Sequence, residues 1–487
     1  MLLLGVYAYF YQAGGWNQNS RFDLVRAVVE DHALQIDRFE ANTGDDARRD
    51  GHYYSDKAPG AAWLCIPPYA AAYYLSGAPD PVAPGWLAWA AWFSIVLAVG
   101  VPSAIAAVFV GRLAGALGAA PWGRALASLG WGLGTMALPY ATLLYGNQLA
   151  ASSLVIAFAL LVEVRRGAAP TRTRLLVIGA LLAFSGACEY TVALIAAPIA
   201  VYGGLVVGWR RAAWAILGGV VPAAALLGYH AAAFGGPFTF PYDYSVWDTP
   251  RTGWFMGIHA PSAQVLALLL VGPYRGLLYS TPWLVFAVPG AISLARRHRA
   301  EVAVCACAVL GFVVFNASIP PWGGGWAPGP RYLVPMLPFA VALACGVFGW
   351  IASALRSPSR PRRAVALGGA VVVSLTLVVS VANMFAATAV RPEVDIRWNR
   401  PYEEFVWPSF RSGLVSVSTQ SIDMDANLPG GPRAAWNLGM KLGLDGHASL
   451  VPLYAWILAC AAWLAIALRR AVPVTPSRDA ASGEGGT

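Results

Sequence analysis

Two long apolar runs flank a short arginine-rich connection in the stretch YLVPMLPFAVALACGVFGWIASALRSPSRPRRAVALGGAVVVSLTLVVSVANMFAA (332–387). The runs cover residues 332–354 and 364–387 and contain no charged side chain, whereas four arginines lie between residues 356 and 363. About 20 apolar residues of helix cross the hydrocarbon core of a bilayer, which is roughly 30 Å thick. Arginines collect in connections on the cytoplasmic side. The stretch therefore predicts two membrane-spanning helices joined by a cytoplasmic turn.

The composition extends this pattern to the whole chain. Of its 487 residues, 58% are hydrophobic and only 12% are charged, and the mean hydropathy is +0.57. Soluble globular domains carry about 25% charged residues, so the composition argues against a soluble enzyme, and the apolar content argues against a disordered chain. The formal charge of +9 comes from 33 basic and 24 acidic residues. Because the arginines form short groups between apolar runs, they indicate membrane topology rather than a nucleic-acid-binding face.

The arginine groups recur after most apolar runs and indicate how the chain is threaded. If every group lies in the cytoplasm, neighbouring groups are separated by an even number of crossings and both termini lie inside. We therefore predict an all-α polytopic membrane protein with about 12 transmembrane helices. The predicted spans are 1–13, 86–110, 123–143, 147–164, 173–187, 190–208, 212–233, 263–295, 302–318, 332–354, 364–387 and 449–468. All six cysteines fall within apolar stretches, which predicts buried packing residues instead of disulfides or a zinc site.

Two apolar stretches need a separate interpretation. Residues 59–77 contain two adjacent prolines, and counting them as a crossing would invert every later arginine group, so we expect an interfacial or re-entrant helix. Residues 263–295 are interrupted by glycines, a proline and Arg275, which predicts a discontinuous helix. The predicted membrane domain covers residues 1–470, and residues 471–487 are expected to form a disordered cytoplasmic tail. The predicted outer loops are 14–85, 234–262, 319–331 and 388–448.

The first outer loop carries an unusual share of the charge. Residues 14–60 hold nine of the 24 acidic residues and six basic ones, and most of these acids are expected to be solvated. Residues 20–34 have apolar and charged side chains at helical spacing, which predicts an amphipathic helix that Ser20 opens and that lies along the membrane surface. The segment YYSDKAPG (53–60) then leads into the interfacial helix. Its aspartate and lysine are thereby expected near the headgroups, where an ammonium is suited to holding a lipid phosphate.

Four segments of the chain share their pattern and order with one family of membrane enzymes. They are NSRFDLVRAVVE (19–30), YYSDKAPG (53–60), GPYRGLLYSTPWLVFAVPG (272–290) and WGGGWAPGPRYLVPMLPF (322–339). The second is similar to the family's Tyr-x-(Glu/Asp)-Lys-Pro-Pro motif, and the last to its Pro-Arg-Tyr-Leu-x-Pro-x-Leu-Pro signature. Together they resemble the GT-C superfamily of glycosyltransferases, most closely the bacterial family-39 and aminoarabinose-transferase-like enzymes. The resemblance implies a GT-C-like domain with a juxtamembrane-helix loop between the first two spans.

The resemblance also implies functional residues, with one departure. In the family, an acidic pair that includes the presumed catalytic aspartate opens the juxtamembrane helix, and Gln18 and Asn19 stand at these positions here. Because an amide side chain cannot act as a general base, another carboxylate is expected to take this role. The candidate catalytic residues, in order of preference, are Asp23, Asp56, Asp45 and Glu40. The candidates for binding the carrier phosphate are Lys57, Arg275, Arg331 and Tyr54.

The implied activity is inverting glycosyl transfer from a polyprenyl-phosphate-linked sugar to a lipid, glycan or protein acceptor of the cell envelope. The active site is expected to face the periplasm or exterior of the inner (plasma) membrane, with membrane lipids around the protein and no nucleic acid as partner. Two alternatives stay open. One is a flippase or transporter of lipid-linked sugars, and the other is a GT-C-like protein without catalysis, which Gln18 and Asn19 would explain.

The remaining titratable residues of the outer loops give weaker signals. No spacing typical of a metal motif connects the outer histidines and their neighbouring aspartates, so no metal site is predicted, and a divalent metal cofactor is left open. These residues are His52, His230, His259, Asp243 and Asp248. The acids of the last outer loop are expected to be solvated surface residues. They are Glu393, Asp395, Glu403 and Glu404.

Overall fold

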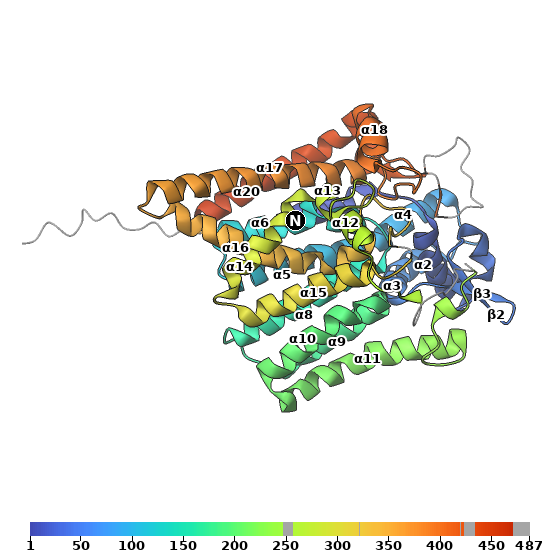
Figure 1. Ribbon diagram of the computed structural model, residues 1–487. Helices are drawn as coiled ribbons and strands as arrows, with labels where there is room; N and C mark the ends of the chain where they lie inside the picture. The colour runs from blue at the N-terminus through green and yellow to red at the C-terminus, as the bar shows by residue number, and fades with distance from the viewer. Residues whose placement is uncertain (247–256, 321, 419, 423–433, 471–487) are drawn as a thin grey trace, which may run out of the picture.

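The computed structural model describes residues 1–246, 257–320, 322–418, 420–422 and 434–470. Helices dominate it, and the longer ones lie roughly side by side (Figure 1). The helices of the first half are α1 (Leu2–Ala8), α2 (Trp16–Arg26), α3 (Gly60–Leu75), α4 (Pro84–Ile95), α5 (Val101–Ala116), α6 (Pro121–Gly134), α7 (Ala137–Tyr140), α8 (Gly146–Arg165), α9 (Arg172–Cys188), α10 (Ala193–Val207) and α11 (Trp209–Phe234). Those of the second half are α12 (Ala263–Val271), α13 (Leu277–Ser280), α14 (Ala287–Ala295), α15 (Arg299–Asn316), α16 (Leu337–Leu355), α17 (Arg360–Val390), α18 (Trp407–Arg411), α19 (Leu438–Lys441) and α20 (Val451–Arg470).

Eight helical stretches within the described ranges are long and apolar enough to cross a membrane. Each of them overlaps one of the 12 predicted spans, which confirms the prediction of an all-α polytopic membrane protein. The eight stretches are Pro84–Ala116, Gly146–Arg165, Tyr190–Val207, Trp209–Phe234, Arg299–Asn316, Arg331–Leu355, Arg360–Val390 and Gly446–Arg469.

The other four predicted spans are shorter or interrupted helices. Span 1–13 is wrong in extent, because α1 ends at Ala8 and the chain continues into a strand. Span 123–143 consists of α6 followed by the single turn α7, and span 173–187 is the 17-residue helix α9. The run 263–295 is divided into α12, α13 and α14, which confirms the predicted discontinuity. Prolines in this run lack the backbone donor that a continuous helix requires.

Of two short antiparallel strand pairs in the described residues, one joins segments far apart in the sequence and the other is a local hairpin. In the first outer loop, the hairpin turns at Asp50-Gly51, where both residues have positive φ, as an Asp-Gly pair in a type I′ turn requires. The register of this hairpin sets Asp46 opposite Ser55. The paired strands are β1 (Phe10–Tyr11) with β4 (Trp436–Asn437), and β2 (Asp46–Arg49) with β3 (His52–Ser55).

Helix α2 is buried on every side, which contradicts the amphipathic surface helix predicted over residues 20–34. The helix begins at Trp16 instead of Ser20, and ten of its 11 residues are buried. Its polar side chains find partners inside the protein: Asn19 Nδ2, for example, donates a hydrogen bond to the carbonyl of Asn42 (2.8 Å). Buried polar groups are tolerated when they are bonded in this way. Helix α2 is therefore enclosed by other segments of the protein.

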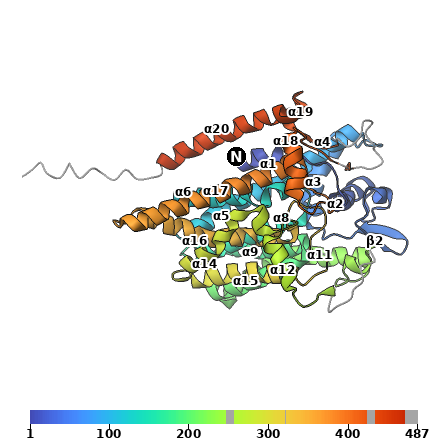
Figure 2. The ribbon, with the colours of Figure 1, turned by 45° about the horizontal axis from the view of Figure 1, so that its top comes forward.

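The connections α8–α9 and α14–α15 meet at one end of the long helices. Arg165 Nε lies 3.2 Å from Glu301 Oε1, and Arg166 Nη2 lies 2.6 Å from His298 Nδ1. Helix α2 and the β2–β3 hairpin lie at the opposite end in both views (Figures 1 and 2). Two of the arginine groups thus share one end of the molecule, and the first outer loop occupies the other.

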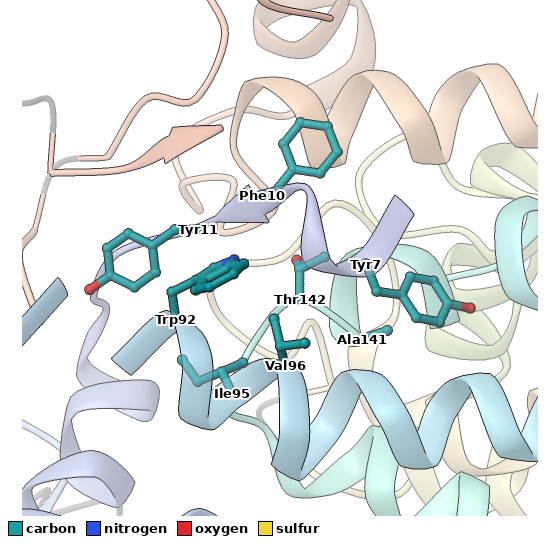
Figure 3. A pocket seen from close by; sticks show the side chains of 8 residues that line it. All are labelled: Tyr7, Phe10, Tyr11, Trp92, Ile95, Val96, Ala141 and Thr142. Atoms are coloured by element: carbon teal, nitrogen blue, oxygen red, sulfur yellow. The ribbon is translucent and has the colours of Figure 1, made fainter. Parts of the chain in front are cut away.

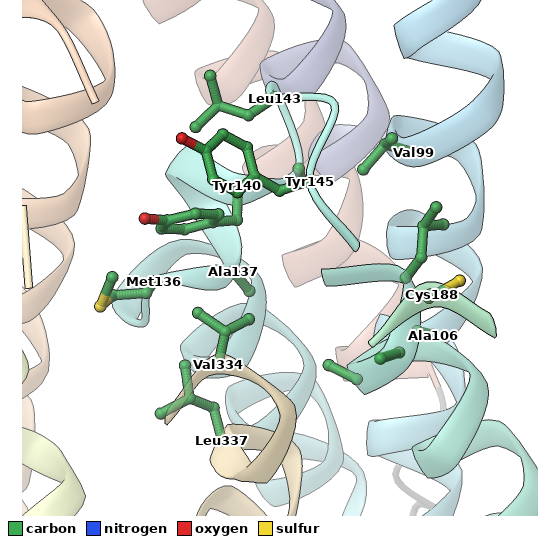
Figure 4. Close-up of a cluster of buried hydrophobic side chains, with 14 of the residues drawn as sticks. Val99, Ala106, Met136, Ala137, Tyr140, Leu143, Tyr145, Cys188, Val334 and Leu337 are labelled. Carbon is green, nitrogen blue, oxygen red and sulfur yellow. The ribbon is translucent and has the colours of Figure 1, made fainter. Parts of the chain in front are cut away.

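Close packing fixes the chain where α7, the start of α8 and the turn η8 (Arg331–Met336) meet (Figure 4). The rings of Tyr140 and Tyr145 contact each other edge to face, with centroids 5.2 Å apart. Met136, Val334 and Leu337 are buried in the same cluster. Tyr145 is therefore held rigidly, with its hydroxyl directed away from this core.

The six cysteines are all free thiols. Four of them are buried, as the sequence predicts, and Cys460 is half-buried. Cys307 is exposed, contrary to the prediction, and lies on α15, one of the helical stretches long and apolar enough to cross a membrane.

Candidate active site

A cavity of about 280 Å³ lies beside the N-terminal end of α2. Its wall combines the start of α2, the residue before β2, the start of α8, the segment before η8 and the segment after α17. Ligand pockets in proteins begin at about this size, roughly 300 Å³. The described charged residues of the wall are Asp45, Arg331, Arg391 and Glu393, and its aromatic residues are Trp16, Tyr145 and Trp326.

A second gap lies next to β1 and contains no candidate chemistry (Figure 3). Its described lining includes Tyr7, Trp92 and Thr142 and no charged side chain, and it has no room for a water molecule. We interpret it as imperfect packing between β1 and α4, and the first cavity as the candidate site.

The β2–β3 hairpin brings two acidic residues to one lysine. Because Asp46 pairs with Ser55, the residues just beyond them, Asp45 and Asp56, lie at the same end of the hairpin. Lys57 Nζ is 3.0 Å from Asp45 Oδ2 and 2.9 Å from Asp56 Oδ1. None of these three side chains is more than 20% exposed. The Lys57 ammonium is therefore already shared by two carboxylates.

The shared ammonium leaves the two carboxyl groups with different pKa values. Burial would raise the pKa of Asp45, but the charge and hydrogen bond of Lys57, together with the charges of Arg331 and Arg21, hold this pKa below its usual value. Asp56 is buried more deeply, and burial raises its pKa in spite of Lys57. Burial alone would lower the pKa of Lys57, but the two carboxylates outweigh it and raise this pKa above its usual value. Asp45 and Lys57 therefore form the firmly charged pair of this cluster.

Glu393 also belongs to the cavity wall and is only 8% exposed, which contradicts its predicted solvated position. The segment after α17 folds back onto α2, so that the carboxylate finds donors inside the protein. Tyr145 Oη donates to Oε1 (2.7 Å), and Gln18 Nε2 donates to Oε2 (3.1 Å). Position 15 requires glycine, because a Cβ on Gly15 would overlap both carboxylate oxygens. Burial raises the pKa of Glu393 above its usual value.

Two guanidinium groups of the described residues face the same cavity. Arg331 opens η8, and its Nη1 lies 3.4 Å from Tyr145 Oη, with the group above the tyrosine ring. Arg391 follows α17 directly and packs against the rings of Phe405 (4.9 Å) and Trp326 (5.6 Å from the centroid). Aromatic faces support a guanidinium group and leave edge N–H donors for an anion. Arg331 was predicted from the sequence, whereas Arg391 was not.

Two other predicted phosphate ligands lie away from the cavity. Arg275 is 1% exposed, and its Nη2 donates to the backbone carbonyls of Gly325 (3.2 Å) and Val394 (3.3 Å). It thereby ties together two segments that line the cavity. Tyr54 packs against Phe234, with ring centroids 5.5 Å apart. Arg275 thus has a positioning role in the structure, and Tyr54 has a packing role.

Of the four predicted catalytic acids, Asp45 is the one that lines the cavity. Asp23 is fully buried within α2, and its Oδ1 accepts a hydrogen bond from Asn42 Nδ2 (3.1 Å). Asp56 is bound to the neighbouring lysine, as described above. Glu40 is half-buried in the turn that precedes the hairpin. The structure therefore brings Asp45 and Asp56 together and sets Asp23 and Glu40 apart from the cavity.

The outer histidines do not converge. His52 Nδ1 lies 2.6 Å from Asp37 Oδ2, and His230 Nε2 lies 2.9 Å from Tyr190 Oη, in separate places. Within the described ranges, no three His, Cys, Asp or Glu side chains form a group suited to a metal ion. Asp248 and the predicted tail 471–487 lie outside the described residues.

Three residues of the cavity wall were not predicted from the sequence as site residues: Glu393, Arg391 and Tyr145. Glu393 meets Gln18 across 375 positions of the chain, so no local spacing connects the two residues. One signal was present at Arg391, which directly follows the long uncharged run of α17. A charged residue next to a membrane-spanning helix is a candidate for a functional residue.

No protein-family model matches the sequence, and no curated protein matches it. Among solved structures, the chain is similar to ArnT from Cupriavidus metallidurans at 15% identity, over 84% of this chain and 76% of that one. The TM-score is 0.46 for the apo state and 0.48 for the state bound to undecaprenyl phosphate. It is also similar to the archaeal oligosaccharyltransferase AglB from Archaeoglobus fulgidus, in complex with an inhibitory peptide and a dolichol-phosphate. That similarity has 12% identity and a TM-score of 0.46, over 77% of this chain and 52% of that one.

Proposed function

We propose that this protein is an inverting glycosyltransferase that moves a sugar from a polyprenyl-phosphate carrier to a cell-envelope acceptor, at the outer face of the inner (plasma) membrane. The observation that carries this proposal is the cavity beside α2. There, Arg331 and Arg391 meet Asp45 and Glu393 at one end of a bundle of membrane-spanning helices. The four sequence segments that resemble GT-C enzymes support the same class of activity.

Such a transfer makes three demands on the protein. The protein must hold the carrier phosphate, stabilise the charge that this phosphate gains as it leaves, and accept the proton of the acceptor hydroxyl. Arg331 and Arg391 are suited to the first two tasks, because a guanidinium group binds phosphate oxygens through parallel N–H donors. A carboxylate of the cavity is suited to the third. A single displacement at the anomeric carbon inverts its configuration.

A transfer assay on the full chain tests this class of activity. Vesicles that contain the purified protein receive a panel of radiolabelled polyprenyl-phosphate sugars together with extracted envelope acceptors. We expect label to move to an acceptor, and the new glycosidic bond to have the opposite configuration to the donor. Absence of transfer with every donor of the panel would contradict the proposal.

A flippase for lipid-linked sugars is the second candidate. Its substrate would pass between leaflets, so charged or polar groups would be needed along the path through the membrane. The charged residues that line the cavity gather at one end of the helices instead. Movement of intact labelled lipid between leaflets, without transfer of its sugar, would favour the flippase.

Removing either cavity arginine should weaken binding of the carrier phosphate. Losing one charge-assisted hydrogen bond costs about 1.5–3 kcal/mol, so Arg331→Ala and Arg391→Ala should each raise the Kd for undecaprenyl phosphate roughly 10- to 150-fold. Arg400→Ala is the matched control, because Arg400 is an exposed arginine of the same outer segment. Titration of the purified variants with undecaprenyl phosphate measures the effect. Equal affinity in all three variants would remove both arginines from the phosphate site.

The arginine groups predict which end of the molecule faces the cytoplasm. Tags inserted in 165–172, 297–299 and 357–362 should be accessible from the cytoplasm, because arginine-rich connections stay on that side. A tag inserted in 40–50 should be accessible from outside. Accessibility of intact cells to an impermeant label measures the difference. If tags in 40–50 and 165–172 react from the same side, the outer-face location is wrong.

A further inference from the structure

Glu393 reaches the cavity from a segment far from the first outer loop. The backbone beside it is fixed by two hydrogen bonds to one carbonyl: Ala327 N and Arg275 Nη2 both donate to Val394 O, at 2.9 and 3.3 Å. A functional side chain needs such rigid support to keep its position. The Glu393 carboxylate is therefore presented to the cavity by an immobilised stretch of chain.

The carboxylate lies next to an amide that is itself fixed. Gln18 Oε1 accepts a hydrogen bond from the backbone N–H of Leu144 (3.1 Å), which directs Gln18 Nε2 toward Glu393 Oε2 (3.1 Å). Gln18 is one of the two amides that stand where similar enzymes carry acids. Position 18 of α2 therefore carries no negative charge, but the Glu393 carboxylate, in the segment after α17, is hydrogen-bonded to it.

Two carboxylates among the described residues line the cavity, and they differ as proton acceptors. Asp45 is paired with Lys57, whose charge lowers the pKa of Asp45 in spite of burial, so it is a weak base. Glu393 accepts hydrogen bonds from the neutral groups of Tyr145 and Gln18, and burial raises its pKa. The charged groups that act on Glu393 are Arg331 and Arg391, and they offset this rise only in part.

We propose that Glu393 is the general base of the transfer and that Gln18 is a positioning residue for it. This inference rests on the proposed function. A lone pair of the acceptor hydroxyl oxygen forms the bond to the anomeric carbon. The bond from this carbon to the carrier phosphate oxygen breaks, and its electron pair stays on the phosphate. The hydroxyl proton passes to a carboxylate oxygen of Glu393 and is released to water once the product has left.

The test compares transfer with phosphate binding in the full chain in vesicles, with undecaprenyl phosphate as the binding probe. Glu393→Gln keeps the shape of the side chain and removes its charge. It should lower transfer from the donor panel by about 10²–10⁴-fold and leave undecaprenyl-phosphate binding in place. Transfer by the wild type should decline as the pH falls through the raised pKa of Glu393, and this decline should be absent in the variant. Glu403→Gln, at an exposed glutamate of the same segment, should transfer like the wild type.

An exchange variant separates a base from a structural residue. The double variant Gln18→Glu/Glu393→Gln exchanges the two side chains, so that position 18 carries the carboxylate and position 393 the amide. One acid and one amide still face each other, so the double variant should recover part of the transfer that Glu393→Gln loses. If Glu393→Gln transfers sugar at the wild-type rate, Glu393 is not the general base, and the proposed glycosyltransferase activity is unaffected. Loss of phosphate binding in step with transfer in both variants would make Glu393 structural and would also overturn its role as the general base. A wild type that neither binds nor transfers would overturn both proposals.

Discussion

Replacing Lys57 by methionine should lower the free energy of unfolding by about 3–5 kcal/mol at pH 7, the typical cost of removing one partner of a buried ion pair. Lys57 is shared by Asp45 and Asp56, whose side chains are 20% and 5% exposed. Both carboxylates would lose their counter-ion in the variant, and water cannot fully replace it. Titration with sodium dodecyl sulfate in mixed micelles measures the difference in unfolding free energy.

The control for this prediction is the other lysine of the chain. Lys441 is exposed and lies over the ring of Trp436, 4.5 Å from its centroid, so Lys441→Met should cost about 0.5–1 kcal/mol. Without Lys57, the pKa values of Asp45 and Asp56 would lie above those of the unfolded chain. The folded state would then bind protons more tightly, and the deficit should shrink as the pH falls. Equal stability of the two variants at pH 7 would contradict the shared ion pair.

Gly15→Ala should reduce glycosyl transfer about 10²-fold, the penalty expected when a reacting group moves by roughly 1 Å. A Cβ at position 15 would overlap both carboxylate oxygens of Glu393. Tyr145 and Gln18 hold the same oxygens at 2.7 and 3.1 Å, so the carboxylate cannot give way without losing a donor. The initial rate of transfer in reconstituted vesicles measures the effect.

Gly85→Ala provides the matched substitution for this second prediction. Gly85 is exposed in the first turn of α4, and a Cβ there would meet nothing within 4 Å. The same change of residue type should therefore leave transfer at the wild-type rate. If Gly15→Ala transfers as fast as Gly85→Ala, the position of the Glu393 carboxylate has no bearing on the reaction.

The membrane class of the fold was predictable because the signal is local. Inside a bilayer, a single apolar segment can satisfy its own backbone polar groups only as a helix. The runs 332–354 and 364–387 therefore appear in the structure as the membrane-spanning stretches Arg331–Leu355 and Arg360–Val390. Span 1–13 was wrong in extent because its last residues pair as β1 with β4, and such a pairing leaves no trace in hydropathy.

Apart from Arg331, the site was predictable only where neighbours in sequence meet. Asp56 and Lys57 are adjacent, and the Asp50-Gly51 turn signal would have placed Asp45 beside them through the hairpin register. The contact between Gln18 and Glu393 spans 375 positions and depends on the packing of α17 against the rest of the bundle. Periodicity and spacing within one segment carry no information about such a contact.

Arg275 illustrates a different limit of the sequence. A buried arginine next to aromatic residues resembles a phosphate ligand in sequence, but in the structure Nη1 and Nη2 of Arg275 donate hydrogen bonds to backbone carbonyls. A buried arginine has only N–H donors, so it needs hydrogen-bond acceptors around it. The sequence shows the charge, and the fold decides whether a ligand or backbone carbonyls accept the hydrogen bonds of the guanidinium group.

The most direct test of a carrier-phosphate site is an experimental structure of the full chain in lipid nanodiscs with undecaprenyl phosphate. We expect density for the phosphate group inside the cavity beside α2, within hydrogen-bond distance of Arg331 and Arg391, and next to the Glu393 carboxylate. If the phosphate group is found bound elsewhere on the protein and this cavity is unchanged, the proposed carrier-phosphate site is wrong.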